Sequence, residues 1–366
     1  MEKVTLGDVA TYINGYAFKP TDWKKEGIRI VRIQDLTGSI NNPNFFQGII
    51  DDKYLIKNGD ILVAWSGSLG VYQWNGGRAY LNQHIFKVEF NKMDIDKRYF
   101  MYLMKSKIDT MYKNTHGSTM KHITKSNFYK IKISLHSKKE QLIIATRLDK
   151  MKKIIEFRKE QLNKLDELIK SQFVEMFGEP LISNNYGRVT LDKLTKVNQG
   201  LQIPISKRFV DSGENRYKYI TIQYLNGGKQ TEYIENPSAR VICKKDDILM
   251  TRTGNTGQVI TNVEGVFHNN FFKVDYDREK LNKEFLICFF EDEGVYRDMI
   301  RRATAATIPD LSHSEFYKMS IDLPPLALQN QFADFVQQVN KLKFEIEKSL
   351  EEMEELYESL MDKYFG

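Results

Sequence analysis

The chain has 366 residues, of which 41% are hydrophobic and 28% charged, and its formal net charge is +6. This composition excludes a wholly disordered chain, and the length favours two or three domains with cores of their own. No stretch approaches the roughly 18 uninterrupted apolar residues of a membrane span, and the first residues lack the apolar segment of a secretion signal. We therefore expect a cytoplasmic protein with no membrane partner.

Residues 1–139 are typical of a β-rich module. Short apolar runs bounded by Gly, Asn and Asp predict strands at 27–33, 60–65 and 85–90, and a helix is expected near 96–113. A Ser-Gly-x-x-Gly turn from Ser66 to Gly70 follows the middle strand. Such a turn lets a ligand approach the backbone closely, or it is a plain hairpin turn. The module has 22 basic and 12 acidic residues, a net charge of +10.

Residues 140–178 predict a long amphipathic helix. Its apolar residues recur at the spacing of three and four that is typical of a coiled-coil seam, and Arg158 and Gln172 occupy two seam positions. We expect the helix to end at Phe177-Gly178, because Gly can adopt a left-handed cap and Pro180 cannot continue a helix. A helix of roughly 35 residues, about 50 Å long, is stable only when its stripe is buried. The predicted stripe consists of Leu148, Met151, Ile155, Leu162, Leu165, Ile169 and Met176.

The same two kinds of segment return in residues 179–327 and 328–366. Strands are predicted at 217–222, 247–252 and 271–276 and a helix near 282–300, and the second module is neutral, with 20 basic and 20 acidic residues. The first long helix has a net charge of +1 and the second of −5, which favours pairing between them. A pseudo-twofold repeat would make the pair antiparallel. The stripe of the second helix consists of Val339, Leu342, Ile346, Met353, Leu356 and Leu360.

Motifs recur in the same order in both halves, which indicates an internal duplication. Val4-Thr5-Leu6 returns as Val189-Thr190-Leu191 near the start of the second half, and Phe177-Gly178 returns as Phe365-Gly366 at its end. The offset between matching motifs drifts only slightly along the chain, which is what small loop insertions within a common fold produce. The stretches between the motifs share almost nothing. Further matches are Asn14-Gly15 with Gln199-Gly200, Ile33-Gln34 with Ile222-Gln223, Asp60-Ile61-Leu62 with Asp247-Ile248-Leu249, Phe86-Lys87-Val88 with Phe272-Lys273-Val274, Phe128-Tyr129-Lys130 with Phe316-Tyr317-Lys318, and Gln141 with Gln329.

Motifs for catalysis are weak. Asn42-Pro43-Asn44-Phe45 is close to the Asn-Pro-Pro-Phe loop of amino-methyltransferases, but no glycine-rich methyl-donor loop precedes it, so we interpret it as a turn. The turn at Ser66 and its repeat, Thr253 to Gly257, lack the Lys-Ser/Thr pair of a phosphate-binding loop. Cys243 and Cys288 stand alone, without a Cys or His at ligand spacing. We expect no catalytic residue and no metal site.

Side chains that could recognise nucleic-acid bases are better represented than motifs for catalysis. Amide and guanidinium side chains make the paired contacts that distinguish adenine and guanine, although the same residues also cap turns. The candidates lie after the predicted strands and in the loops before the last strand of each module. In the first module they are Arg32, Gln34, Asp35, Ser66, Ser68, Gln73, Trp74, Asn75, Arg78, Asn82, Gln83, His84, Ser118, Thr119, Lys121 and His122, and in the second Gln223, Arg252, Thr253, Asn255, Thr256, His268, Asn269, Asn270, Arg301, Arg302, Thr304 and Thr307.

The duplicated order of motifs resembles the specificity subunits of type I restriction-modification systems, over the whole chain. Departures at Leu135-His136-Ser137-Lys138 and Ala305-Ala306-Thr307 weaken the transfer of residue roles at those loops. The motifs that carry the resemblance are Gly59-Asp60-Ile61-Leu62 with Gly67 and Gly70, Gly117-Ser118-Thr119, the segment from Leu323-Pro324-Pro325-Leu326 to Gln329 and Gln331, and the two Phe-Gly helix ends.

The resemblance implies an α+β chain with target-recognition domains at 1–139 and 179–327 and helical spacers at 140–178 and 328–366. Each module would read one half of a split site in double-stranded DNA, and the spacers, paired as an antiparallel coiled coil, would fix the gap. Two modification subunits that hold S-adenosylmethionine would dock on this chain, restriction subunits would join the full complex, and the chain itself would bind no cofactor.

Two other functions fit the same sequence. A non-catalytic adaptor could use the duplicated modules to bind protein, and salt-insensitive or absent duplex binding would favour it. A methyltransferase that acts alone is the third alternative, and it requires methyl transfer by the purified chain.

Overall fold

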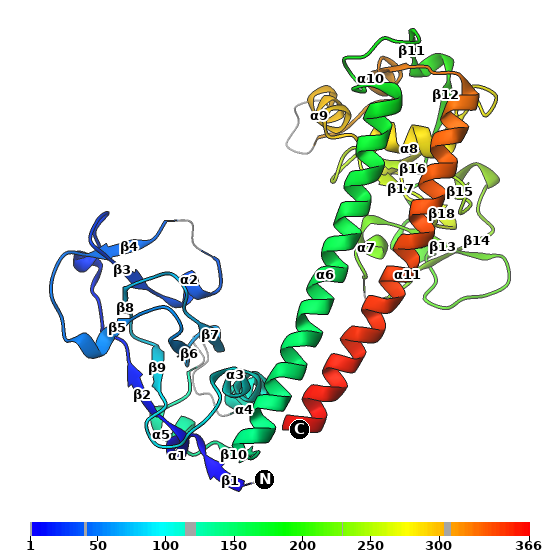
Figure 1. Ribbon diagram of the computed structural model, residues 1–366. Coiled ribbons are helices and arrows are strands. Elements are labelled where there is room, and N and C mark those ends of the chain that lie inside the picture. Colours follow the sequence, from blue (N-terminus) through cyan, green and yellow to red (C-terminus); the bar gives the residue numbers. More distant parts are fainter. Residues whose placement is uncertain (1, 40–41, 114–121, 229, 304–308) are drawn as a thin grey trace. The chain divides into compact units, whose positions relative to one another are not determined.

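The structure is a computed structural model that describes residues 2–39, 42–113, 122–228, 230–303 and 309–366. The chain divides into two compact units, one of residues 1–159 with 348–366 and the other of residues 160–347. Each unit combines a β-rich module with part of each of two long helices, which are green and orange-red in Figure 1. The four segment bounds expected from the sequence remain predictions.

The strands described in the first module form two four-stranded sheets, with the orders β2-β9-β6-β7 and β4-β3-β8-β5, and a β1-β10 pair. Pairing is antiparallel except between β3 and β8. The strands are β1 (Glu2–Thr5), β2 (Thr11–Asn14), β3 (Ile28–Val31), β4 (Asn44–Phe46), β5 (Leu55–Ile56), β6 (Ile61–Ala64), β7 (Gly70–Gln73), β8 (Ala79–Leu81), β9 (Ile85–Glu89) and β10 (Lys132–Leu135). The helices are α1 (Leu6–Val9), α2 (Ile33–Leu36), α3 (Lys97–Ser106), α4 (Ile108–Lys113) and α5 (Lys125–Tyr129).

The second module repeats this topology strand for strand. Its orders are β12-β19-β16-β17 and β14-β13-β18-β15, with a β11-β20 pair, so each strand number is ten higher than that of its counterpart. The strands are β11 (Arg188–Thr190), β12 (Thr195–Gln199), β13 (Arg216–Ile220), β14 (Tyr233–Glu235), β15 (Ile242–Cys243), β16 (Ile248–Thr251), β17 (Val259–Ile260), β18 (Gly265–Phe267), β19 (Phe271–Tyr276) and β20 (Ser320–Asp322). The helices are α7 (Ile222–Leu225), α8 (Lys283–Glu291), α9 (Glu293–Arg302) and α10 (His313–Tyr317).

These elements confirm the predicted duplication and place the six predicted strands on β3, β6, β9, β13, β16 and β19. One detail of the prediction is wrong in both modules. Ile33 and Ile222, predicted as strand ends, are instead the first residues of the short helices α2 and α7. The residue expected in a turn, Asn44, begins the edge strand β4. The glycine-containing turn lies in a hairpin, because β6 and β7 pair antiparallel on either side of it, and the approach of a ligand to this turn stays a prediction.

A glycine at the same point of each module lets two chain segments touch. A Cβ atom on Gly15 would lie 2.0 Å from the carbonyl oxygen of Asn82, and one on Gly200 would lie 2.2 Å from that of His268. We expect Gly15→Ala to destabilise the first unit by about 1–3 kcal/mol, because the backbone must shift to admit the methyl group. Gly213→Ala, whose Cβ would meet only the flexible side chain of Arg216, is the control. Urea unfolding of both variants checks this, and equal midpoints would contradict it.

The two long helices are α6 (Lys138–Phe177) and α11 (Leu326–Phe365), each of 40 residues and therefore about 60 Å long. As predicted, α6 ends at Phe177, and the Gly178 that follows has a φ of 82°. Within the first unit Lys159 pairs with Glu354 at 2.7 Å, and within the second Lys343 pairs with Asp166. Residue numbers rise along α6 as they fall along α11, so the predicted antiparallel coiled coil is confirmed.

The predicted stripe of α6 is correct, since all seven of its residues are buried or partly buried. The stripe of α11 is wrong at two positions. Leu342 and Leu356 are 57% and 50% exposed, whereas their neighbours Lys343 and Tyr357 are partly buried. The ammonium group of Lys343 reaches Asp166 of α6, and the aliphatic stem of a lysine tolerates partial burial.

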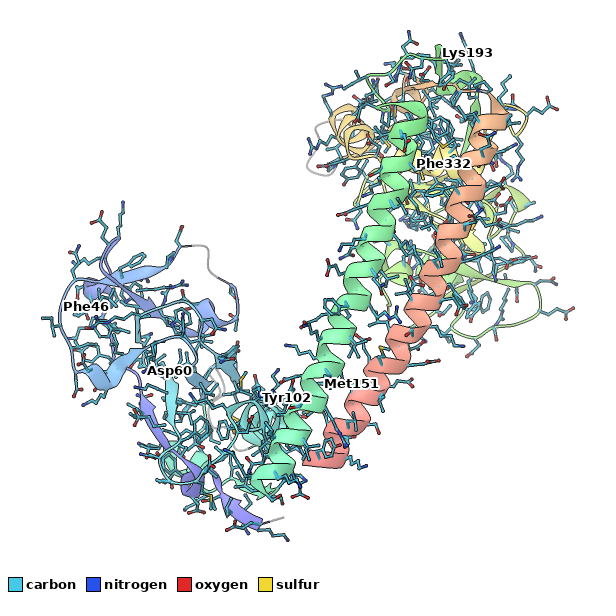
Figure 2. The ribbon with its side chains drawn as sticks, in the orientation of Figure 1. Phe46, Asp60, Tyr102, Met151, Lys193 and Phe332 are labelled. Carbon is cyan, nitrogen blue, oxygen red and sulfur yellow. The ribbon has the colours of Figure 1, made fainter. Side chains whose placement is uncertain are left out.

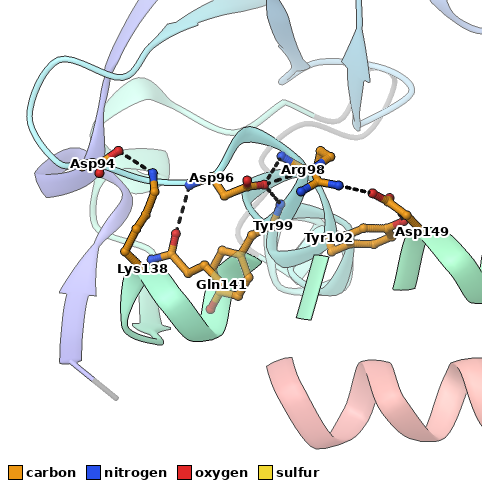
Figure 3. Close-up of polar contacts among 8 residues, drawn as sticks. All are labelled: Asp94, Asp96, Arg98, Tyr99, Tyr102, Lys138, Gln141 and Asp149. Atoms are coloured by element: carbon orange, nitrogen blue, oxygen red, sulfur yellow. Dashed lines mark hydrogen bonds and ion pairs between the residues drawn. The ribbon is translucent and has the colours of Figure 1, made fainter. Parts of the chain in front are cut away.

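Matched buried amides fix the start of each long helix to its module. The Gln141 side chain accepts a hydrogen bond from the Asp96 backbone N–H at 3.0 Å, and in the second unit Gln329 accepts one from the Asn282 N–H at 2.8 Å. Asp96 and Asn282 are the N-caps of α3 and α8. Figure 3 shows further contacts in the first unit, where Asp149 of α6 accepts hydrogen bonds from Arg98 and Tyr102 at 2.8 and 2.7 Å.

Each module core includes side chains from both long helices. In the first unit Leu148 of α6 and Phe365 of α11 are buried in the main cluster. In the second unit Phe173 and Phe177 of α6 meet Phe332 of α11, which is labelled in Figure 2. A module and the helix segments in its unit are therefore one packed body.

Candidate functional site

Three backbone hydrogen bonds gather the candidate loops of the first module. The Asn82 N–H donates to the Val31 carbonyl at 3.0 Å, which joins the β8–β9 loop to the end of β3. The Trp65 N–H donates to the His84 carbonyl, and the Ile123 N–H donates to the Trp65 carbonyl, both at 3.1 Å. We call residues 31–35, 65–70, 82–84 and 122–123 loop cluster 1.

The same three bonds recur in the second module. The His268 N–H donates to Ile220 at 3.0 Å, the Arg252 N–H donates to Asn270 at 2.8 Å, and the Leu311 N–H donates to Arg252 at 2.9 Å. We call residues 220–224, 252–257, 268–270 and 310–311 loop cluster 2. The bonds establish equivalent positions, so that Trp65 corresponds to Arg252. One backbone frame therefore holds two different sets of side chains.

The predicted site residues differ in exposure. Those exposed in the loop clusters are Gln34, Ser68, Gln223 and Asn255, while Asn82, Gln83, His84, His122, Thr253, His268, Asn269 and Asn270 are half-buried. Ser66, Trp74, Thr256 and the side chain of Asp35 are buried, so in this structure they support the loops rather than face solvent. Ser118, Thr119, Lys121, Thr304 and Thr307 lie outside the described residues.

The segment from Gln73 to Arg78 is not part of loop cluster 1. The β6–β7 register pairs Ala64 with Gly70 beside the turn and Ile61 with Gln73 at the other end. Gln73, Asn75 and Arg78 are exposed there. Trp74 packs inward, and its indole N–H donates to the Gly77 carbonyl at 2.6 Å.

A buried carboxylate of loop cluster 1 holds Arg32 of the same cluster and Arg29 of β3. The Asp35 side chain, which has no exposed surface, accepts a hydrogen bond from the Arg29 guanidinium at 2.9 Å and from the Arg32 backbone N–H at 3.0 Å. The Arg32 guanidinium lies 3.8 Å from the same carboxylate and 5.1 Å from the centre of the Trp23 ring. Two guanidinium groups share one carboxylate, so this corner keeps a positive charge.

In loop cluster 2 the charge of Arg252 is neutralised by the carboxylate of Asp310. The Arg252 guanidinium binds Asp310 through two hydrogen bonds of 2.8 and 2.7 Å, and the Thr253 hydroxyl adds a third at 3.3 Å. Hydrogen bonding by Arg252 is the main cause that holds the pKa of Asp310 below its usual value. Sequence reasoning missed Asp310. It occupies the place in the repeat that His122 occupies in the first module, and this correspondence is the signal that could have found it.

Arg301 and Arg302 extend from the end of α9. Both pair with Asp298, whose side chain is buried, and Arg302 also lies 3.8 Å from Glu315. The Arg301 side chain is nevertheless largely exposed. Arg301 thus remains able to contact an anion, whereas Arg302 is held against the module.

Histidines occupy strained or crowded places in both clusters. His84 has a φ of 75°, an uncommon value outside glycine, and its ring packs 5.0 Å from that of Trp65. Burial, and then the nearby His122, lower the pKa of His84. Burial, and then Arg208, lower the pKa of His268. Both rings therefore favour the neutral form in the free protein.

We expect the free energy of unfolding to fall as the pH drops below about 6.5, the ordinary pKa of histidine. The unfolded chain then takes up protons that the folded chain resists through its lowered pKa values, so folding loses stability until the folded groups also protonate. The double variant His84→Gln/His268→Gln should show a flatter pH dependence. Urea unfolding between pH 7.5 and 5 measures both, and identical slopes would contradict the assignment.

The described residues give no support to a metal site or to a membrane span. Among the described residues, no group of three or more His, Cys, Asp or Glu side chains is arranged to hold a metal ion. No helix in the described part of the chain is long and apolar enough to cross a membrane.

Comparison with known proteins gives one consistent result. The chain is 26% identical over 170 residues to the Type I restriction enzyme EcoBI specificity subunit of Escherichia coli, a match that spans 46% of this chain and only 36% of that subunit. It is 21% identical over 401 aligned positions to the MjaVIII specificity subunit of Methanocaldococcus jannaschii, covering 99% of this chain and 91% of that one.

Solved structures share the fold. The S subunit of a type I restriction-modification system from M. genitalium superposes with a TM-score of 0.60 at 16% identity, over 100% of this chain and 96% of its own. A chain from a structure that concerns assembly and conformational transition of the type I R-M system gives 0.63 at 16% identity, covering 100% and 97%. The family model for the type I restriction modification DNA specificity domain matches residues 1–167 and again 184–355. The chain therefore belongs to the type I restriction modification DNA specificity domain family, of which it contains two copies.

Proposed function

We propose that this chain is the DNA sequence-specificity subunit of a type I restriction-modification complex, in which each module reads one half of a bipartite, asymmetric site. The observation that carries the proposal is the pair of loop clusters. Identical backbone hydrogen bonds present Trp65, His84 and His122 in one module and Arg252, Asn270 and Asp310 in the other. The same backbone arrangement with different side chains suits two modules that recognise different base sequences.

The paired helices would set the gap between the half-sites. Each is about 60 Å long, which is comparable to between one and two turns of duplex DNA at 34–36 Å per turn. The stretch of helix between the modules would also offer docking surface to two modification subunits, and restriction subunits would complete the assembly. S-adenosylmethionine would bind to the modification subunits, so this chain would be non-catalytic and act in the cytoplasm.

Salt dependence of duplex binding by the assembled complex tests this proposal. Contacts to phosphate release counterions, and each one neutralised lowers log K by roughly 0.9 per decade of salt. The +10 charge of residues 1–139 leads us to expect a fall in affinity of several hundred-fold or more between 50 and 200 mM salt. Binding that ignores salt, or no duplex binding, would instead favour a protein-binding adaptor.

A labelled methyl donor tests the non-catalytic assignment. We expect purified chain alone to transfer no methyl group to a duplex that the complete complex methylates. Transfer by the isolated chain would overturn the assignment and would point to a methyltransferase that acts alone.

A further inference from the structure

We infer that Lys24 and Lys25 form a phosphate-contacting edge by which the first module captures the duplex, and that the second module engages afterwards. The inference rests on the proposed function and adds to it the order in which the two readers act. Neither lysine was among the site residues predicted from the sequence.

Matched backbone contacts identify the equivalent edge in both modules. Lys24 and Phe45 exchange two backbone hydrogen bonds, of 2.8 and 3.1 Å, just as Phe209 and Tyr233 do at 2.9 and 2.8 Å. The residue after Lys24 is Lys25, and the residue after Phe209 is Val210. At these two positions the first module therefore carries two ammonium groups, and the second carries a phenyl ring and an isopropyl group.

The surroundings of the two edges differ as much as the residues. Lys24 and Lys25 are exposed, and among the described residues no carboxylate lies within ion-pairing distance of either. In the second module the Arg216 guanidinium covers Phe209 at 3.7 Å, and Val210 is 57% exposed. An exposed, unpaired ammonium group is free to meet a phosphate, whereas an exposed valine is not.

The lysine edge adjoins loop cluster 1 through Trp23. This ring lies under the Arg32 guanidinium, which belongs to the positively charged corner around Asp35. The equivalent of Trp23 in the second module is Arg208, which pairs with Glu232 at 2.9 Å and lies over the Tyr219 ring. Asp22 and Glu26 flank the lysines, yet residues 19–35 hold five basic and three acidic side chains, so the stretch from the edge to the candidate reading loops keeps a net positive charge.

Seven of the nine arginines of the second module pair with a carboxylate of the same module. Because of this ion pairing and a net charge of zero, the second module has little electrostatic field at a distance to attract a DNA duplex. The arginine pairs of the second module include Arg208 with Glu232, Arg216 with Glu235, Arg252 with Asp310, Arg278 with Asp246, and Arg302 with Asp298.

Uncompensated positive charge on a module acts mainly on the association rate constant. Uncompensated positive charge steers a polyanion during the encounter and makes the association rate depend on salt, whereas short-range contacts made after docking act on the dissociation rate. The charged first module should therefore govern the association rate constant, and the neutral second module should govern mainly how long the complex lasts.

Stopped-flow binding of the assembled complex to a fluorescent duplex that contains its recognised site tests this order. Lys24→Gln/Lys25→Val should lower the association rate constant several-fold at 50 mM salt and reduce its salt slope by about two, with little change in dissociation. The reciprocal Val210→Lys should raise the association rate and the salt slope by about one. Lys193→Gln/Lys196→Gln removes two exposed charges from the second module outside this edge as the matched control, and it should change association by less than twofold.

Two outcomes would overturn the inference. One is an equal loss of association rate in the two double variants, and the other is an unchanged rate in Lys24→Gln/Lys25→Val. Either can be told apart from failure of the proposed function, because wild-type complex would still bind its site specifically and with the expected salt dependence.

Discussion

Insertion of three heptads into each long helix is expected to widen the gap between the two half-sites by about nine base pairs. Twenty-one added residues lengthen a helix by about 32 Å, and each base pair of duplex DNA takes up about 3.4 Å. The ion pair of Lys159 with Glu354 shows which residues of α6 and α11 face each other within the first unit, so the insertions would follow Lys159 and precede Glu354. Insertions at these two points keep the antiparallel seam in register.

The length of three heptads matters because the duplex is helical. Nine base pairs come close to one full turn, so both modules would again meet the same face of the DNA. A single heptad adds about 10 Å, or roughly three base pairs, and leaves the half-sites about 100° out of phase. We therefore expect the single insertion to weaken binding and methylation. Sequencing of methylated positions in host DNA reads both results, and an unchanged gap after the longer insertion would rule out the helices as the ruler.

Phe177→Ala is expected to destabilise the second unit by about 3–5 kcal/mol. The Phe177 ring is buried, and its centre lies 4.8 Å from that of Phe285 in α8 and 5.5 Å from that of Phe332 in α11. Its loss would leave a cavity where three elements meet. Val174→Ala on the preceding turn is the control, because Val174 is already 36% exposed and should cost under about 1 kcal/mol.

Hydrogen exchange can assign the loss to the correct unit. In Phe177→Ala we expect the amides of β16 and β19 to lose protection, while those of β6 and β9 keep theirs, because they belong to the other compact unit. Equal loss in both units would show that the two are not separately stabilised, and no loss would show that the aromatic cluster does not hold α6 to the second module.

The architecture could be predicted because duplication leaves collinear motifs. The Phe-Gly ends, the strand before each glycine turn and the paired glutamines each serve the same structural role twice, and such roles constrain the sequence. Gln141 and Gln329 illustrate this, since both reach the backbone at the N-cap of a neighbouring helix. The short helices α2 and α7 were missed because four residues are too few to show a helical period.

The side-chain chemistry of the loop clusters was beyond sequence reasoning. Asp35 was chosen as a DNA contact, but its side chain is buried against Arg29 of β3 and Arg32 at the N-cap of α2. Arg252 meets Asp310 only because a segment far along the chain returns beside β16. On α11, hydrophobicity favoured Leu342 for the seam, whereas an ion pair with Asp166 makes Lys343 fit there. Such pairs depend on geometry that spacing in the sequence does not express.

Exchange of the first module tests the central claim most directly. Residues 1–139 would be replaced by the corresponding segment of another member of the family with a different site, and methylated positions would be mapped in the DNA of a strain that carries the complete system. If each module recognises its half-site independently and the paired helices fix the gap, one half of the site will change while the other half and the gap stay as they were. A change in both halves, or in neither, would contradict the account.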